Sequence, residues 1–444
     1  MYTFSSKLKT FSFALMIIGA LGVGYGFLSA PSTLEDVKEM LSHESHDTHA
    51  VDTHVADAHA TEEHTTEGHA ATTHGNEDAH AIHVLHQLQN RPWSALYIAI
   101  FFFLLISLAT LAFYAIQHAT QAGWSIVLFR VMEAIAAYLP IGGILLFVFL
   151  MLSGAHMNHL FVWMDPEVVA GDTLLENKAG YLNVPFFLLR AAIYIAGWSF
   201  FQWHSRKLTM AQDKVDTGNY RKLFKRSAAF LVFFLITESM MSWDWIMSLD
   251  PHWFSTLFGW YIFSSGIVSA VTVIALVTMY LKSQGYLEIV SDSHLHDLAK
   301  YMFGFSVFWT YLWFSQFMLI WYANIPEEVT YFITRFEDYR LPFLGMVGLN
   351  FVFPVLVLIN SDFKRVNWFV IITGIVILIG HYIDIFVMVM PATVGKQWFI
   401  GIPEIGSVML IAGIFIYVVF NALSKAPLIV KNNPYIKESE GFHY

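Results

Sequence analysis

Long apolar stretches, separated by shorter polar segments, form most of this chain. A helix needs about 20 apolar residues to cross a bilayer, and ten stretches reach that length. They cover roughly residues 11–28, 92–117, 124–152, 184–204, 227–249, 257–282, 299–323, 341–361, 368–391 and 403–424. The pattern predicts an all-α polytopic membrane protein with ten transmembrane helices. We expect the first stretch to be a retained helix, because Pro31 follows its small-residue end and hinders signal-peptide cleavage.

Parts of this pattern occur twice. Pro-Phe pairs open the fourth and eighth stretches at Pro185 and Pro342, and Asp244 and Asp384 each lie seven residues before a proline. We therefore expect two parallel four-helix bundles flanked by two peripheral helices. The predicted segments are 1–30 (first transmembrane helix), 31–91 (loop), 92–252 and 253–392 (the two bundles), 393–424 (last transmembrane helix) and 425–444 (cytoplasmic tail).

The basic residues are unequally divided between the two sides. Sixteen Lys and Arg residues lie on the side of both termini and six on the opposite side. Cytoplasmic loops carry the excess of Lys and Arg, so we expect both termini in the cytoplasm. The loop 31–91 then lies outside the cytoplasm.

This loop carries twelve Asp and Glu against two Lys and Arg, which accounts for the net charge of −10. Its composition is typical of an acidic, disordered segment. A histidine recurs there at every fifth position, a period that suits neither a helix nor a strand. We interpret the loop as a solvated linker, with loose metal binding as the alternative. The recurring histidines are His54, His59, His64, His69 and His74.

Several ionisable residues fall inside the apolar stretches, where a charge costs roughly 2.5–3.5 kcal/mol on insertion scales. A carboxyl group in apolar surroundings can exchange protons near neutrality, as a proton relay requires. Ordered by depth from the cytoplasm, the proton-path candidates are Glu133, Glu238, Asp384 with His381 and Asp244, Arg190, and Glu404.

Two arginines also have simpler interpretations. Arg130, near the cytoplasmic end of the third stretch, is expected to extend to the membrane surface. Arg190 serves equally well as a structural counter-ion for Asp244 or Asp384.

The chain has no cysteine, which excludes covalently attached haem, iron–sulfur clusters and a thiolate zinc site in this chain. Haem b is disfavoured because His381 is the only deep histidine. We predict no resident metal and no catalytic residue. Candidates for contact with a quinone are Asp244, His252 and His381.

Two long motifs resemble known sequences. They are MSWDWIMSLDPHWFSTLFGWY (Met241–Tyr261) and FGFSVFWTYLWFSQFMLIWYANIPEE (Phe303–Glu328). Both are similar to the NrfD/PsrC-like membrane subunits of alternative complex III, a bacterial quinol:electron-acceptor oxidoreductase. The resemblance covers most of residues 90–425, and the chain length and acidic loop resemble the F-type more than the paralogous C-type subunit.

The resemblance implies a bacterial inner-membrane protein in a multi-subunit respiratory complex. Its partners would be the paralogous NrfD-like subunit, subunits that carry haem and iron–sulfur clusters, lipid and, as a further partner, a terminal oxidase. Quinol or menaquinol would be the electron donor, and nucleic acid is not expected. We therefore expect a subunit that supports proton conduction and anchors the redox subunits. Direct quinol binding by this chain is the alternative, and an independent secondary transporter is the second alternative.

Overall fold

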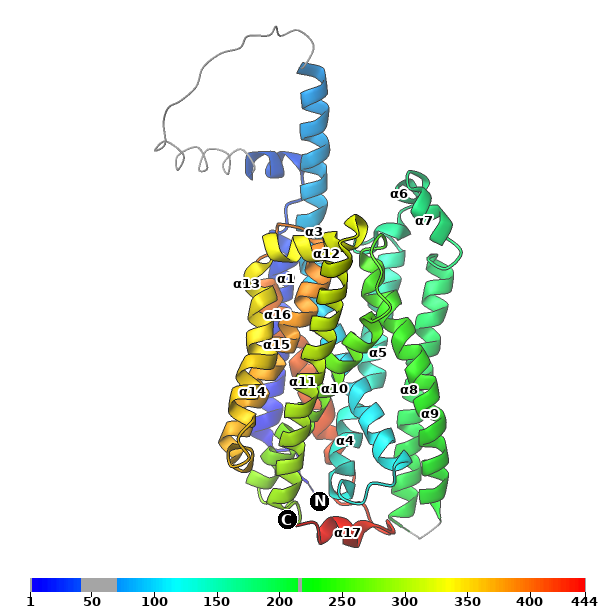
Figure 1. The fold of residues 1–444 in the computed structure, drawn as a ribbon, viewed down its shortest axis with the longest axis vertical. Helices are drawn as coiled ribbons and strands as arrows, with labels where there is room; N and C mark the ends of the chain where they lie inside the picture. The colour runs from blue at the N-terminus through cyan, green and yellow to red at the C-terminus, as the bar shows by residue number, and fades with distance from the viewer. Residues whose placement is uncertain (1, 41–69, 215–217, 444) are drawn as a thin grey trace.

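A computed structural model describes residues 2–40, 70–214 and 218–443 of the chain. In this structure the protein is all-helical, and the described part contains ten helices long and apolar enough to cross a membrane. The prediction of an all-α polytopic membrane protein is confirmed. The long helices run side by side, and both termini lie at one end of the molecule (Figure 1).

The first half of the chain supplies five of these spans. Its helices are α1 (Ser6–Ser29), α3 (Ala70–Ala119), η1 (Ile126–Leu128), α4 (Phe129–Ala136), α5 (Leu139–Gly154), η2 (Val162–Met164), α6 (Pro166–Ala170), α7 (Thr173–Lys178), α8 (Val184–Gln212), α9 (Asn219–Trp245) and η3 (Met247–Leu249). The third predicted stretch is interrupted between α4 and α5, immediately before Pro140. Proline lacks the N–H that a continuous helix needs at this position.

The second half supplies the other five spans. Its helices are α10 (Phe258–Ser283), α11 (Asp292–Ala323), α12 (Pro326–Glu337), α13 (Arg340–Val347), the π-helical turn η4 (Gly348–Val352), α14 (Phe353–Leu358), η5 (Phe363–Arg365), α15 (Asn367–Thr393), α16 (Ile402–Leu423) and α17 (Ile436–Glu440). The eighth stretch is thus a helix with a π-helical turn just before Pro354. Because proline cannot donate to the preceding turn, the hydrogen-bond ladder widens there.

Helices α3 and α10 form the centre of the molecule. About nine tenths of the most apolar window of each helix is buried, and the two helices pack against each other. Each is the first helix of one predicted repeat. The division into two bundles with boundaries at 92, 252 and 392 stays a prediction.

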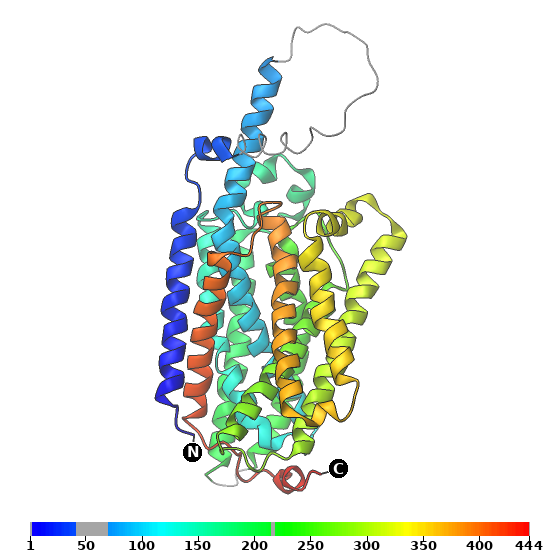
Figure 2. The ribbon, with the colours of Figure 1, turned by 90° about the vertical axis from the view of Figure 1, so that its left-hand side faces the viewer.

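Helices α1 and α16 pack tightly together at one edge of the molecule (Figure 2). Glycines make this possible: a Cβ atom on Gly19 would lie 2.3 Å from the Leu410 backbone nitrogen, and one on Gly413 would lie 2.7 Å from the Ser12 carbonyl oxygen. Small residues let helix backbones approach closely in membranes. The apolar outer surface of α1 is left exposed, which is typical of a lipid-facing helix.

The prediction of disorder over residues 31–91 is wrong for the parts of this segment that the structure describes. Residues 34–40 are helical, and α3 begins at Ala70, far before the predicted start at residue 92. Val37 packs against Ala81 and Val84 in a small apolar cluster, which supports the two helices outside the main body. Composition alone misses this contact because the apolar residues are few and widely spaced.

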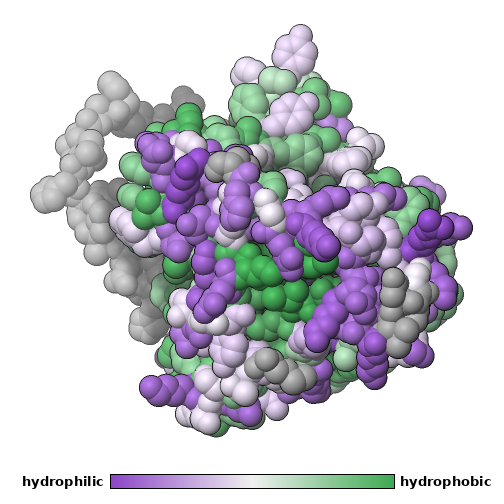
Figure 3. All heavy atoms as spheres, turned by 90° about the horizontal axis from the view of Figure 1, so that it is seen from below, coloured by the Kyte–Doolittle hydropathy of each residue, from purple (hydrophilic) through white to green (hydrophobic). Residues whose placement is uncertain are grey.

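Seen from the end that carries both termini, the surface has polar residues around its rim and an apolar area at its centre (Figure 3). The C-terminal segment crosses this end, where the Lys431 amide donates to Asp213 and Asn432 exchanges hydrogen bonds with Gln212. The tail therefore ties α16 to α8.

Candidate functional site

The first buried carboxylate, Asp244 on α9, forms a closed ion pair with Arg190 on α8. Nε and Nη2 of Arg190 each donate to one carboxylate oxygen at 2.8 Å. The Tyr194 hydroxyl adds a third hydrogen bond at 3.0 Å. Asp244 has no exposed surface at all. This bidentate arrangement is the strongest form of arginine–carboxylate pairing.

The guanidinium of Arg190 is itself held in place. Its Cζ atom lies 3.8 Å from the ring centroid of Tyr181 and 4.3 Å from that of Phe186. Nη1 donates to the Tyr181 carbonyl oxygen at 3.0 Å. The structure therefore pairs Arg190 with Asp244 and not with Asp384, in the manner of a structural counter-ion.

The second buried carboxylate, Asp384 on α15, has different partners. The Tyr261 hydroxyl on α10 donates to Oδ1, and the Trp309 indole N–H on α11 donates to Oδ2 at 2.9 Å. His381, one turn earlier on α15, places Nδ1 3.6 Å from Oδ2 and 2.9 Å from the Ser265 hydroxyl. Both Asp384 and His381 are fully buried. Residues three apart on a helix lie on the same face, which agrees with this contact.

Arg335 on α12 is a buried residue that the sequence reasoning missed, because it lies between two apolar stretches. Only 4% of its surface is exposed. Nη1 donates to the Tyr331 carbonyl oxygen at 2.8 Å, and Cζ lies 3.3 Å from the Tyr331 ring centroid. Among the described residues no carboxylate lies within ion-pair distance of it. The available signal was its position four residues after Tyr331, on the same face of an amphipathic helix.

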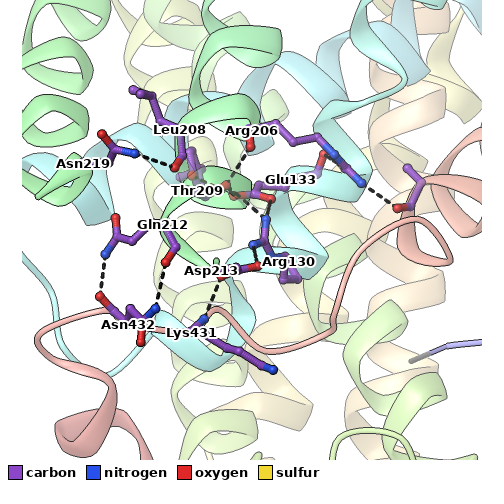
Figure 4. A network of polar contacts seen from close by, with 12 residues as sticks. Arg130, Glu133, Arg206, Leu208, Thr209, Gln212, Asp213, Asn219, Lys431 and Asn432 are labelled. Atoms are coloured by element: carbon purple, nitrogen blue, oxygen red, sulfur yellow. Dashed lines mark hydrogen bonds and ion pairs between the residues drawn. The ribbon is translucent and has the colours of Figure 1, made fainter. Parts of the chain in front are cut away.

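Glu133 on α4 belongs to a network near the end that carries the termini (Figure 4). Arg130 contacts Glu133 at 2.5 Å and also pairs with Asp213 at the end of α8. Hydroxyls of Tyr114 and Thr209 donate to Glu133 Oε1 at 3.0 and 2.8 Å. The expectation that Arg130 extends to the surface is therefore wrong: it is 3% exposed, because two carboxylates hold it inside.

The two remaining acidic candidates differ sharply. Glu404, at the start of α16, accepts hydrogen bonds from Arg91 Nε at 2.8 Å and Nη2 at 3.1 Å, and from the Gly401 amide. Glu238, seven residues before the end of α9, is 3% exposed, and its Oε1 atom has no hydrogen-bond partner in the described part of the chain. Glu238 thus differs from the ion-paired acids.

The proton-path candidates do not form one continuous chain of contacts. Within the described segments, no hydrogen bond or ion pair leads from the Glu133 network to Glu238, or from Glu238 to the Asp244 or Asp384 sites. The quinone candidates also have separate partners, since His252 contacts Asp172 at 2.5 Å in the loops around α7. The depth of a residue within its predicted helix could not reveal these contacts, because the partners come from helices far apart in the chain.

An apolar cleft of about 380 Å³ lies beside the Asp244 site. Tyr181, which stacks on Arg190, forms part of its wall, and so does Ser248, whose hydroxyl donates to the Asp244 carbonyl oxygen. Lys178 adds one charged group. The cleft can accommodate a flat apolar ring that needs few polar contacts.

The candidate loose metal ligands lie outside the described residues or among those whose side chains are not described, so they stay a prediction. They are His54, His59, His64, His69 and His74. The chain matches no family model and no curated protein.

Proposed function

We propose that this integral membrane protein supports proton movement across the membrane as a subunit of a respiratory quinol-oxidising complex of the alternative complex III type, and that it anchors the redox subunits. The respiratory assignment rests on the two sequence motifs at Met241–Tyr261 and Phe303–Glu328. The proton assignment rests on the partners of Asp384. Haem and iron–sulfur clusters belong to the partner subunits in this proposal.

The key observation is that Oδ1 of Asp384 faces a hydroxyl group, that of Tyr261. A hydroxyl can donate or accept a hydrogen bond, whereas a guanidinium can only donate. A proton can therefore occupy Oδ1 of Asp384 while the Tyr261 hydroxyl turns to accept its bond. At Asp244 both carboxylate oxygens face Arg190 N–H groups, so a proton there would break the ion pair.

Glu238 is the second group suited to proton exchange. A buried carboxylate without a partner is strongly disfavoured in apolar surroundings. Glu238 has no cation within ion-pair distance among the described residues, so its charge is not compensated in the way that those of Glu133, Asp244 and Glu404 are. In this proposal the three paired acids stabilise the fold, and Glu238 and Asp384 exchange protons.

The test is proton translocation per electron, measured with the complex reconstituted in vesicles. We expect Asp384→Asn and Glu238→Gln each to lower this ratio while electron transfer from quinol continues. Glu337→Gln, an exposed acid on α12, is the matched control and should behave like the wild type. An unchanged ratio in both buried-site variants would remove the proton assignment.

Direct quinol binding by this chain is the second candidate, and the apolar cleft beside Asp244 favours it. It predicts that Lys178→Met, on the cleft wall, raises the apparent KM for quinol with little change in kcat. A KM equal to that of the wild type would place the quinol elsewhere in the complex.

Purification tests the assembly itself. A respiratory subunit should copurify from native membranes with haem-bearing partners, which a visible spectrum detects. A chain purified alone, in full yield, would instead favour an independent secondary transporter.

A further inference from the structure

The space between Arg335 and Asp384 contains a small cavity enclosed by α10, α11, α12, α13 and α15. Its volume is about 10 Å³. Roughly 10–15 Å³ of space for the centre of a water-sized sphere is enough for one water molecule. Charged and polar side chains line it together with apolar ones, and among the lining residues are Arg335, Asp384, Gln316 and Trp313.

Three polar atoms of these cavity-lining residues lack a hydrogen-bond partner within the described part of the protein. They are Nε of Arg335, Nε1 of Trp313 and Oε1 of Gln316, each shielded from solvent. Leaving such an atom unsatisfied costs roughly 1–3 kcal/mol, and more when the group is charged. Three such atoms around one cavity therefore indicate that a small polar molecule binds there.

The donors and acceptors around the cavity match the bonding capacity of water. Arg335 and Trp313 each offer one free N–H donor, and Gln316 offers one free acceptor. Each carboxylate oxygen of Asp384 makes one hydrogen bond in the structure and has capacity for another. One water molecule accepts two hydrogen bonds and donates two, which satisfies two donors and two acceptors.

We propose that this cavity is a binding site for a single internal water molecule that links the Arg335 guanidinium to the Asp384 carboxyl group. The guanidinium is held by the carbonyl oxygens of Tyr331 and Met388, so it reaches the carboxyl through the water and not through a direct ion pair. The water is the partner from which Asp384 receives, or to which it gives, a proton. That last role rests on the proposed function.

Other ionisable groups surround the pair on every side. Those within electrostatic reach of Arg335 or Asp384 are Tyr261 on α10, Tyr331 on α12, Tyr339 between α12 and α13, His381 on α15 and Asp250 after η3. Of these groups, Tyr261 and Tyr331 line the cavity together with Arg335 and Asp384.

The test uses the complex purified from native membranes, with the Gln316→Leu variant as the main change. Leucine has nearly the same size and removes one acceptor, so the fold should be retained. A high-resolution cryo-EM map should show one water density between Arg335 and Asp384 in the wild type and none in Q316L. Infrared difference spectra recorded in isotopically labelled water should lose one internal-water band. Gln284→Leu, at an exposed site after α10, is the control and should keep both signals.

The possible outcomes separate the water site from the proposed function. A direct contact of Arg335 with Asp384, a density too strong for water, or an unchanged water band in Q316L would overturn the water site. If the water is present and Q316L lowers proton translocation per electron, both proposals are supported. If the water is present and translocation is unchanged in Q316L, Asp384→Asn and Glu238→Gln, the water site stands and the proton assignment is removed.

Discussion

Asp244 and Asp384 are equally buried, but one has a charged partner and the other has neutral hydrogen-bond donors. Each aspartate lies seven residues before a proline, and each is fully buried. Asp244 is bound on both oxygens by one guanidinium, whereas Asp384 is bound by a hydroxyl and an indole N–H. Burial alone therefore does not decide what a membrane carboxylate can do. What also matters is the charge of its partner, and whether that partner can both donate and accept a hydrogen bond.

The two sites differ because their arginines come from different helices. Arg190 lies five residues after Pro185, inside the transmembrane helix α8. The corresponding position after Pro342 is Val347, which has no charge. The arginine of the second site, Arg335, comes from the preceding helix α12 and is bound to carbonyl oxygens of Tyr331 and Met388. The second site thus has a small cavity lined by Arg335 and Asp384, whereas at the first site Arg190 binds the carboxylate directly.

The largest effect should come from breaking the closed pair. Arg190→Met leaves Asp244 buried without a cation, and removing one partner of a buried ion pair costs about 3–5 kcal/mol. We expect a large loss of folded protein, measured as the thermal stability of the complex in detergent. Adding Asp244→Asn to this variant should restore much of the loss. Full stability of the single variant would show that the pair is not needed.

The matching change at the Asp384 site should cost less. Arg335→Met removes a cation that binds carbonyl oxygens, and no carboxylate of the described segments lies at ion-pair distance to be left unpaired. We expect a loss of roughly 1–3 kcal/mol, in the range for a buried polar group. Thermal stability compared with Arg190→Met tests the ranking. A larger loss for Arg335→Met than for Arg190→Met would contradict the comparison.

Tyrosine substitutions compare the hydroxyls of the two sites. Tyr261→Phe and Tyr194→Phe each remove one hydrogen bond to a carboxylate, at a cost of about 1 kcal/mol. We expect only Tyr261→Phe to lower proton translocation per electron, because Asp244 stays bound to Arg190 in the other variant. Equal effects of the two substitutions on translocation would remove the functional difference between the sites.

The smallest effect concerns the loops at the end of the molecule opposite both termini (Figure 1). The hydrogen bond from His252 is the main cause that lowers the pKa of Asp172 below its ordinary value of 3.8, and backbone amides of Leu174 and Leu175 add to it. A carboxyl whose pKa is lower in the folded protein stabilises the fold above its unfolded pKa, and this stability is lost as the pH falls through its folded pKa.

We therefore expect Asp172→Asn to lower the melting temperature slightly at neutral pH and to bring it closer to that of the wild type at about pH 3, below the ordinary pKa of aspartate. Glu176→Gln, an exposed acid on α7, serves as the control. A difference in melting temperature that grows on acidification would contradict this dependence of stability on pH.

Much of the fold could be predicted from the apolar pattern. The ten spans agree with the predicted stretches because bilayer thickness sets a minimum length for an apolar helix, whatever its neighbours are. An even number of membrane crossings places both termini at the same end of the molecule, and they lie so in the structure (Figure 1). The helical segments at 34–40 and from Ala70 could not be predicted, because their support comes from the contact of Val37 with Ala81 and Val84.

The sequence by itself determined that acidic groups lie at membrane depth, since Glu133, Glu238, Asp244 and Asp384 fall inside apolar stretches. Only the tertiary structure decided which of them have a cation as partner. Arg130 and Arg335 turn inward, although their positions in the sequence suggested a surface location. The physical reason is that an ion pair or a hydrogen bond depends on distances of about 3 Å between helices, and the order of residues along the chain does not specify these distances.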